Sequence, residues 1–99
     1  MIEIRILGPA HEYIQRQLKD SEKGILKADI EAIQSGDFES VHVKKLRGKI
    51  YELIFGSHRI TYFQRNGKLY LVRGFRKTSN KTPKREIEYA QKIYKTIKK

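Results

Sequence analysis

Residues 50–77 read IYELIFGSHRITYFQRNGKLYLVRGFRK, and they contain three strand-like runs joined by two tight turns. The strongest signal is Asn66-Gly67, because a two-residue type I′ turn needs positive φ at both central positions. Apolar and aromatic residues alternate over 59–65 and 70–75 on either side of it, and the run 50–55 precedes them across Gly56-Ser57. The stretch predicts a three-stranded antiparallel meander.

A strand and two helices are expected ahead of the meander. Isoleucines alternate with charged residues over 2–6, as in a strand with one buried face. Apolar residues then recur at three- and four-residue spacing in two successive segments, which predicts two amphipathic helices. Asp20 or Ser21 is expected to cap the second helix and Gly36 to close it. Neither helix can bury its apolar stripe alone, so we expect a hairpin lying on the sheet.

A last helix is expected to follow the meander, with Thr82 as its cap and Pro83 in its first turn. The predicted fold is therefore α+β. An antiparallel sheet, made of the N-terminal strand and the meander, packs against an N-terminal helical hairpin, with a C-terminal helix. The length of 99 residues predicts one domain, 1–99.

The net charge of +11 is concentrated in one segment. Residues 44–85 carry thirteen Lys and Arg against Glu52 alone, whereas 1–43 carry five against eight Asp and Glu. Like charge at this density destabilises a fold by self-repulsion, so it calls for a polyanionic or acidic partner. A merely solvated basic surface is the alternative, but solubility alone favours charges of both signs interspersed.

Several kinds of site are excluded or disfavoured. The chain has no cysteine, which rules out disulfides, thiolate metal sites and a catalytic thiol. His11, His42 and His58 lack the spacing and acidic neighbours of metal ligands, so we expect surface or capping histidines and no metal. Phosphate-loop and dinucleotide motifs are missing too, so no cofactor is expected. The N-terminus resembles neither a signal peptide nor a membrane span, which favours a cytoplasmic protein.

Strict alternation from the Asn66-Gly67 turn assigns residues to the two faces of the meander. One face is expected to hold Arg59, Thr61, Phe63, Tyr70, Val72 and Arg76. The other, more apolar face, under the helical hairpin, is expected to hold Ile60, Tyr62, Leu69, Leu71, Arg73 and Phe75.

This arrangement brings Arg59 and Arg76 together at one end of the exposed face, with Lys77 beside them. Two guanidinium groups and an ammonium group form a phosphate site by geometry. The alternative is that they pair with helix carboxylates. Phe63 and Tyr70 on the same face are candidates either for stacking on unpaired RNA bases or for core residues under the last helix.

Four motifs carry a family resemblance. They are Lys45-Leu-Arg-Gly-Lys-Ile-Tyr-Glu-Leu, Arg59-Ile-Thr-Tyr, Gly74-Phe-Arg-Lys-Thr and Thr82-Pro. Together they resemble the RelE/HigB toxins of type II toxin–antitoxin systems, in particular the phage-derived Gp49-like branch. The resemblance covers nearly the whole chain. It implies a toxin that enters the ribosomal A site, cleaves messenger RNA and so inhibits translation, and that is neutralised by a helix-turn-helix antitoxin.

The resemblance also implies roles for individual residues. The catalytic residues would be Arg59, Arg76, Lys77 and Lys49. RNA contacts would come from Lys45, Arg47, Arg73, Thr78 and Lys81. The implied reaction is metal-independent attack of a ribose 2′-OH on the adjacent phosphate, with Lys77 or Lys49 as the base. Ile54 departs from the family pattern, because many members have arginine there, and the proton donor of some relatives has no clear counterpart.

Two rival functions are compatible with the same residues. One is a ParE-like gyrase poison, which has the same fold but acts by binding protein. The other is a non-catalytic module that binds RNA or the ribosome.

Overall fold

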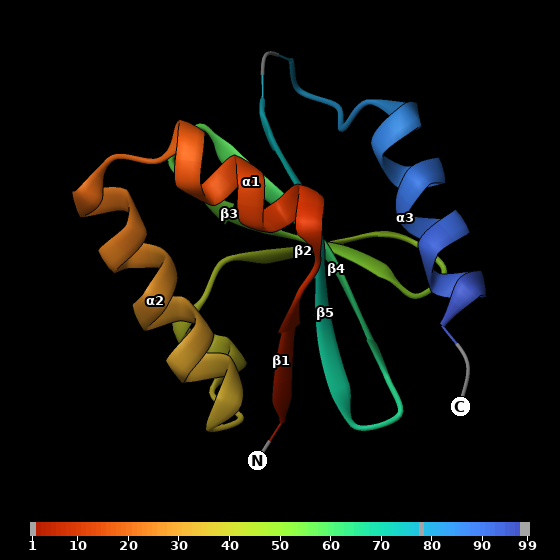
Figure 1. Cartoon of the computed structure of the whole chain (residues 1–99), viewed down its shortest axis with the longest axis horizontal. Helices are drawn as coiled ribbons and strands as arrows, with labels where there is room; N and C mark the ends of the chain where they lie inside the picture. Colours follow the sequence, from red (N-terminus) through yellow and green to blue (C-terminus); the bar gives the residue numbers. More distant parts are fainter. Residues whose placement is uncertain (1, 78, 98–99) are drawn as a thin grey trace.

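Five strands form one sheet at the centre of the molecule (Figure 1). The computed structural model describes residues 2–77 and 79–97, and no helix in that part of the chain is long and apolar enough to cross a membrane. The strands are β1 (Glu3–Ile6), β2 (Val43–Arg47), β3 (Ile50–Phe55), β4 (His58–Arg65) and β5 (Lys68–Arg76), in the spatial order β1-β5-β4-β3-β2. The helices are α1 (Gly8–Gln17), α2 (Asp20–Gln34), the short 3-10 helix η1 (Phe38–Ser40) and α3 (Lys84–Thr96).

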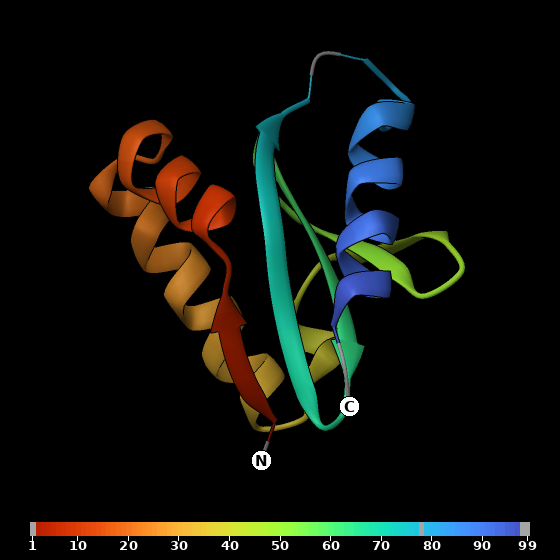
Figure 2. The same ribbon diagram turned by 45° about the vertical axis from the view of Figure 1, so that its right-hand side comes forward.

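The helices cover both faces of the sheet, and each face has its own core. Figure 2 shows α1 and α2 on one side of β5 and α3 on the other. On the hairpin face, Ile14, Leu26 and Ile33 pack with Ile60 and Leu71. The α3 face has the smaller core of Ile50, Phe63, Val72 and Ala90. The predicted helical hairpin on the sheet is confirmed.

The α+β class is confirmed, with two corrections to the sheet. β1 pairs in parallel with β5, so the sheet is mixed and not wholly antiparallel. The strand β2 was not predicted. It pairs with β3 through a two-residue turn in which Gly48 has φ +56°. Its exposed lysines suit an edge strand, because charged side chains discourage further pairing, and they hide the apolar alternation that marks a strand.

Two expected helix caps are wrong. The helix α2 begins at Asp20 with Lys19 as its N-cap, and the Lys19 N–H donates to the Glu22 carboxylate at 2.8 Å. The helix α3 has Pro83 as its N-cap, while the Thr82 hydroxyl donates to buried Glu52 at 2.8 Å. Gly36, with φ +84°, follows the end of α2 as expected.

The β4–β5 register follows strict alternation from Asn66-Gly67 only close to that turn. Arg65 pairs with Lys68 and Phe63 with Tyr70, as expected from Asn66-Gly67. The pairing then shifts, so that Tyr62 faces Leu71 but Thr61 faces Arg73. A β-bulge at Val72 adds one residue to β5 and reverses the faces beyond it. Strict alternation therefore misplaces the end of β5.

Candidate active site at the end of the meander

Arg59 folds back over the turn between β3 and β4. Its Nη1 donates to the carbonyl oxygens of Gly56 at 2.7 Å and of His58 at 2.9 Å. Its Nε is buried and has no hydrogen-bond partner within the described chain, nor does the guanidinium pair with any carboxylate there. A cation held in place by neutral oxygens keeps its charge available to a ligand.

Lys77 comes to the same turn from β5. Its N–H donates to the Ser57 carbonyl at 2.8 Å. A shallow depression of about 370 Å³ lies here, lined by Ser57, Arg59, Lys77, Ser79 and Asn80. This lining combines two cations with hydroxyl and amide groups and includes no carboxylate among the described residues. Such a lining suits an anion.

Arg76 reaches the turn from the other face of the sheet. His58 pairs with Arg76 and Arg59 with Phe75, so the prediction that both arginines share one face is wrong. The bulge at Val72 is the cause. The exposed Arg76 guanidinium nevertheless donates to Ser57 Oγ at 3.0 Å, in the turn whose Gly56 carbonyl receives Arg59. The two arginines therefore meet at the turn, although they approach it from opposite faces.

Lys49 does not belong to this cluster. It precedes β3, whereas the cluster follows the end of that strand, and six residues of strand span about 20 Å. It lies instead beside a wider hollow, of about 630 Å³, with Tyr51, Tyr62 and Arg65 in the lining. Burial and the neighbouring Tyr51 raise the pKa of Tyr62 to about 12.

The residues expected to contact RNA are also dispersed. Lys45 and Arg47 are exposed on the edge strand β2, and Lys81 is exposed in the loop before α3. Thr78 lies outside the described residues. Arg73 is on the α3 face instead of the expected hairpin face, where its Nε pairs with Glu86 at 2.8 Å and its guanidinium lies 4.0 Å from the Tyr89 ring centre.

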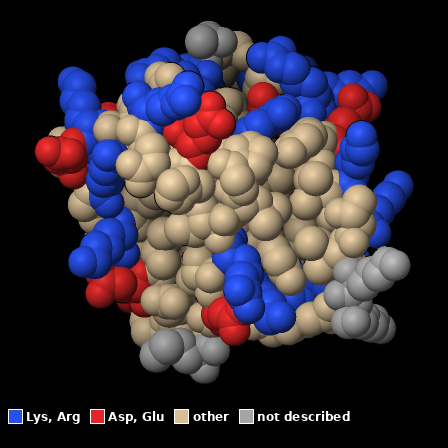
Figure 3. All heavy atoms as spheres, in the orientation of Figure 1, with Lys and Arg blue, Asp and Glu red and all other residues tan. Residues whose placement is uncertain are grey.

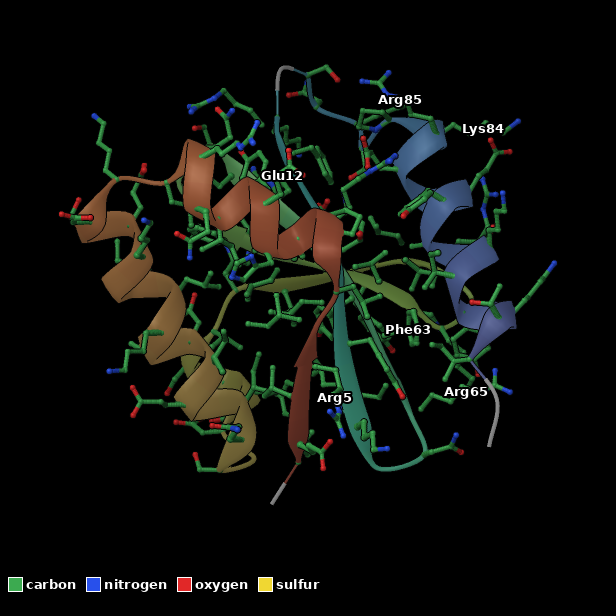
Figure 4. The ribbon with its side chains drawn as sticks, viewed as in Figure 1. Arg5, Glu12, Phe63, Arg65, Lys84 and Arg85 are labelled. Atoms are coloured by element: carbon green, nitrogen blue, oxygen red, sulfur yellow. The ribbon has the colours of Figure 1, made fainter. Side chains whose placement is uncertain are left out.

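For Phe63, which stacks with Tyr70, the structure decides between stacking on RNA bases and packing in the core. Phe63 is fully buried, stacks on Tyr70 at 5.1 Å between ring centres and meets the Tyr94 ring of α3 edge-on at 5.0 Å. Figure 4 shows Phe63 between the sheet and α3. Phe63 is therefore core and not a base-stacking platform.

The buried carboxylate of Glu52 anchors the loop after β5. It lies opposite Thr61, two residues along β3 from the partner of Arg59, and so faces α3 as Arg59 does. One carboxylate oxygen accepts the Thr82 hydroxyl, and the other has no partner in the described part of the chain. The sequence marked Glu52 only as the one acid of a basic segment.

A buried histidine lies beside this cluster and was missed. His58 is 1% exposed, although a surface or capping role was expected. Its Nε2 lies 2.9 Å from a Glu22 carboxylate oxygen and its Nδ1 lies 2.8 Å from the Tyr13 hydroxyl. These partners come from α2 and α1, 36 and 45 positions away, so no local motif could have revealed them.

The electrostatics of the three groups are coupled. The pKa of Glu22 is lowered, first by the hydrogen bond from the Lys19 N–H and then by that with His58. The pKa of Tyr13 is raised by burial, against the opposing effect of the Arg76 charge. The phenol is thus neutral, and it lies within electrostatic reach of Arg76.

Charge gathers at this end of the molecule. Figure 3 shows many Lys and Arg side chains, with a few Asp and Glu among them, along the upper edge, where Figure 1 places the loop between β5 and α3, while the middle of that view is largely uncharged. Lys84 and Arg85 lie at the start of α3 beside this loop (Figure 4). The cations of the turn therefore belong to a wider positive edge.

Comparison with known proteins places the chain in a family. A family model described as phage-derived protein Gp49-like matches residues 13–95, well over half of the sequence. The chain belongs to the Gp49-like family. No curated protein matches this Gp49-like chain.

Two solved structures share the fold of the Gp49-like chain. The intact RelBE toxin–antitoxin complex of E. coli contains a chain with TM-score 0.61 and 19% identity, over 80% of this chain and 100% of that one. A copper-bound mutant toxin from Helicobacter pylori has TM-score 0.58 and 16% identity, over 77% of this chain and 94% of that one. The resemblance to RelE is thus confirmed at the level of the fold.

Proposed function

We propose that this Gp49-like protein is the toxin of a type II toxin–antitoxin pair and that it cleaves messenger RNA on the ribosome. The observation that carries the proposal is the depression lined by Arg59 and Lys77, in which no described carboxylate neutralises the cations. The fold supports it, because the similar chains come from a toxin–antitoxin complex and a toxin.

The cations suit the transition state of phosphodiester cleavage. When a ribose 2′-OH attacks its phosphate, negative charge grows on the phosphoryl oxygens, and donors already in place stabilise it most. Arg59 is held by two carbonyl oxygens and Arg76 by Ser57, so neither must reorganise as charge develops. Lys77 adds a third positive charge. The described lining of this depression holds no carboxyl group or histidine to act as a general acid, which suits an enzyme whose substrate is positioned by the ribosome.

The resemblance to RelE/HigB toxins suggests the partners, and the charge distribution is consistent with them. Messenger RNA in the ribosomal A site supplies the polyanion that the basic segment requires, which also implies a cytoplasmic protein. The antitoxin would be a helix-turn-helix protein with an acidic surface for the positive edge of the toxin. Its gene is expected beside that of the toxin.

The test is inducible expression in a bacterium, followed by primer extension on messenger RNA. Wild type is expected to arrest growth and to produce cuts in phase with codons. Arg76→Ala and Lys77→Ala are each expected to lower cleavage by about 10² to 10³-fold, as for loss of one donor to a developing oxyanion. Lys27→Ala, which removes an exposed lysine on α2, is the matched control and should cut normally.

Other outcomes point elsewhere. Intact transcripts together with a DNA-damage response would replace the ribonuclease by a gyrase poison of the same fold. Normal growth with ribosome binding would leave a non-catalytic module. Full cleavage by both alanine variants would remove the turn cluster from the mechanism.

A further inference from the structure

The contacts of His58 form a proton relay with a defined direction. An ionised carboxylate can only accept, so His58 Nε2 carries the hydrogen that Glu22 receives, and in the neutral imidazole Nδ1 is left to accept the Tyr13 hydroxyl proton. Glu22 is itself fixed by the Lys19 N–H at 2.8 Å. This is the connectivity of a hydroxyl activated by a histidine that a carboxylate orients.

The relay ends beside the phosphate-binding cations. His58 and Arg76 are partners across β4 and β5, and the Arg76 guanidinium is bonded to Ser57 of the depression. Tyr13, at the other end of the relay, is half-buried and lines a second depression of about 320 Å³ along β5. Arg76 therefore bonds to a residue of one hollow and acts electrostatically on a residue of the other, and one RNA strand crossing the end of β5 would meet both.

Close packing fixes the position of the Tyr13 ring. A Cβ built on Gly74 would come within 2.3 Å of Tyr13 Cδ2, so only glycine allows the ring to lie on β5 at this point. The ring also meets His58 edge-on, with 5.8 Å between ring centres. The Tyr13 hydroxyl is held in one position while part of the ring remains exposed. This arrangement would allow the side chain to act on a bound substrate as well as to pack.

We propose that Tyr13, backed by His58 and Glu22, is the general base that activates the ribose 2′-OH; this inference rests on the ribonuclease function proposed above. The 2′-oxygen forms a bond to phosphorus as the bond from phosphorus to the 5′-oxygen breaks. The 2′ proton passes to the Tyr13 oxygen while the phenolic proton passes to His58 Nδ1, and Glu22 stabilises the imidazolium.

The proton balance closes with solvent. Water protonates the departing 5′-oxygen and becomes hydroxide, and the imidazolium returns its proton through Tyr13 to that hydroxide. The products are a 2′,3′-cyclic phosphate and a 5′-hydroxyl. Lys77 is then free to act as a cation and need not lose its proton, which removes the difficulty of a lysine base at neutral pH.

This mechanism makes cleavage depend on pH through His58. The groups that face it are Tyr13 from α1, Glu22 from α2, the neutral Phe55 ring from β3 and Arg76 from β5. Once protonated, the imidazole cannot accept the phenolic proton, so cleavage is expected to slow as the medium becomes acidic.

The experiment compares Tyr13→Phe and His58→Asn with wild type in single-turnover cleavage of messenger RNA on programmed ribosomes. The pH is varied over about 5 to 8. Tyr13→Phe keeps the ring, and His58→Asn keeps an acceptor for Tyr13 but cannot take up a proton. Tyr51→Phe, which also removes one phenolic oxygen, is the matched control.

Both relay variants are expected to lose about 10² to 10⁴-fold in rate, the usual contribution of general base catalysis. They should also lose the decline toward acidic pH while retaining ribosome affinity and folded-state circular dichroism. A role in packing alone would not change the pH profile. Normal rates in Tyr13→Phe would overturn the relay and leave the ribonuclease intact, whereas a wild type that never cuts would overturn both.

Discussion

The Tyr13 ring lies directly on Gly74, so close that a methyl group on the glycine would meet Tyr13 Cγ at 2.5 Å. The contact ties α1 to the last part of β5, and it determines where the Tyr13 hydroxyl meets His58. Any side chain larger than the hydrogen atom of glycine at position 74 would therefore force the Tyr13 ring, and with it α1, to move.

Gly74→Ala is expected to destabilise the protein by about 1–3 kcal/mol, because overpacking forces the ring or the backbone to shift. Urea unfolding measures the change. Gly24→Ala is the control, and its change in unfolding free energy is expected to have the opposite sign. That glycine lies within α2 with nothing near its missing Cβ, so alanine should stabilise by about 0.5–1 kcal/mol. Equal stability of Gly74→Ala and wild type would contradict the close contact.

Thr82→Val tests the anchor of the loop after β5. The change removes the hydroxyl that donates to Glu52. The fully buried carboxylate of Glu52 then loses the hydrogen bond that Thr82 donates. The expected cost is about 1–3 kcal/mol in thermal or urea unfolding. Thr96→Val removes an exposed hydroxyl that bonds to a helix carbonyl and should change stability by much less. A similar small effect at both threonines would show that Glu52 does not depend on Thr82.

Glu86→Gln tests the ion pair that holds Arg73 on the α3 face. Glu86 is 6% exposed and accepts the Arg73 Nε, so removing its charge leaves a partly buried cation unbalanced. Breaking fully buried pairs costs about 3–5 kcal/mol, and the partial exposure of Arg73 reduces the expected loss to about 1–2 kcal/mol. Glu88→Gln on the exposed side of α3 serves as the control in the same unfolding assay. Unchanged stability in Glu86→Gln would mean that the pair contributes nothing.

Tyr62 predicts a specific sensitivity to alkali. Its pKa is about 12 in the folded protein against 10.0 ordinarily, so between these values the unfolded chain releases a proton that the folded chain retains. The stability that this tyrosine contributes is complete below pH 10 and is lost as pH rises toward 12.

The unfolding free energy of wild type is therefore expected to fall more steeply over this window than that of Tyr62→Phe. Tyr70→Phe, whose hydroxyl is not part of the Tyr51–Tyr62 stack, should follow wild type. Parallel curves for all three proteins would exclude the tyrosine effect.

The elements that the sequence predicted well are those encoded locally. Asn66-Gly67 indicated the β4–β5 hairpin, and the structure has positive φ at both residues, 56° and 75°. The apolar spacing of α1 and α2 indicated the helical hairpin. In each case the signal lies within a few residues of the feature it determines.

The features that were missed depend on distant contacts. Nothing near Val72 indicates a bulge, yet that extra residue turns Arg73 toward Glu86 and Arg76 away from the face of Arg59. His58 looked like an isolated polar residue, because its partners belong to helices near the other end of the chain. Of the catalytic residues expected, Arg59, Arg76 and Lys77 meet at the turn, but Lys49 lies at the opposite end of β3.

The parallel pairing of β1 with β5 sets the order in which the molecule can be completed. Glu3 needs Lys68 as its partner, so the strand β1 must wait for β5, the last of the five described strands to be synthesised. Until then the apolar stripe of α1 and α2 lacks the β5 side chains Leu69 and Leu71 of its core, and closing so long a loop is slow relative to local hairpins. A chain interrupted before residue 68 would leave Ile14, Leu26 and Ile33 without their β5 neighbours and should aggregate or be degraded, so the turn assembles only once β5 has been synthesised.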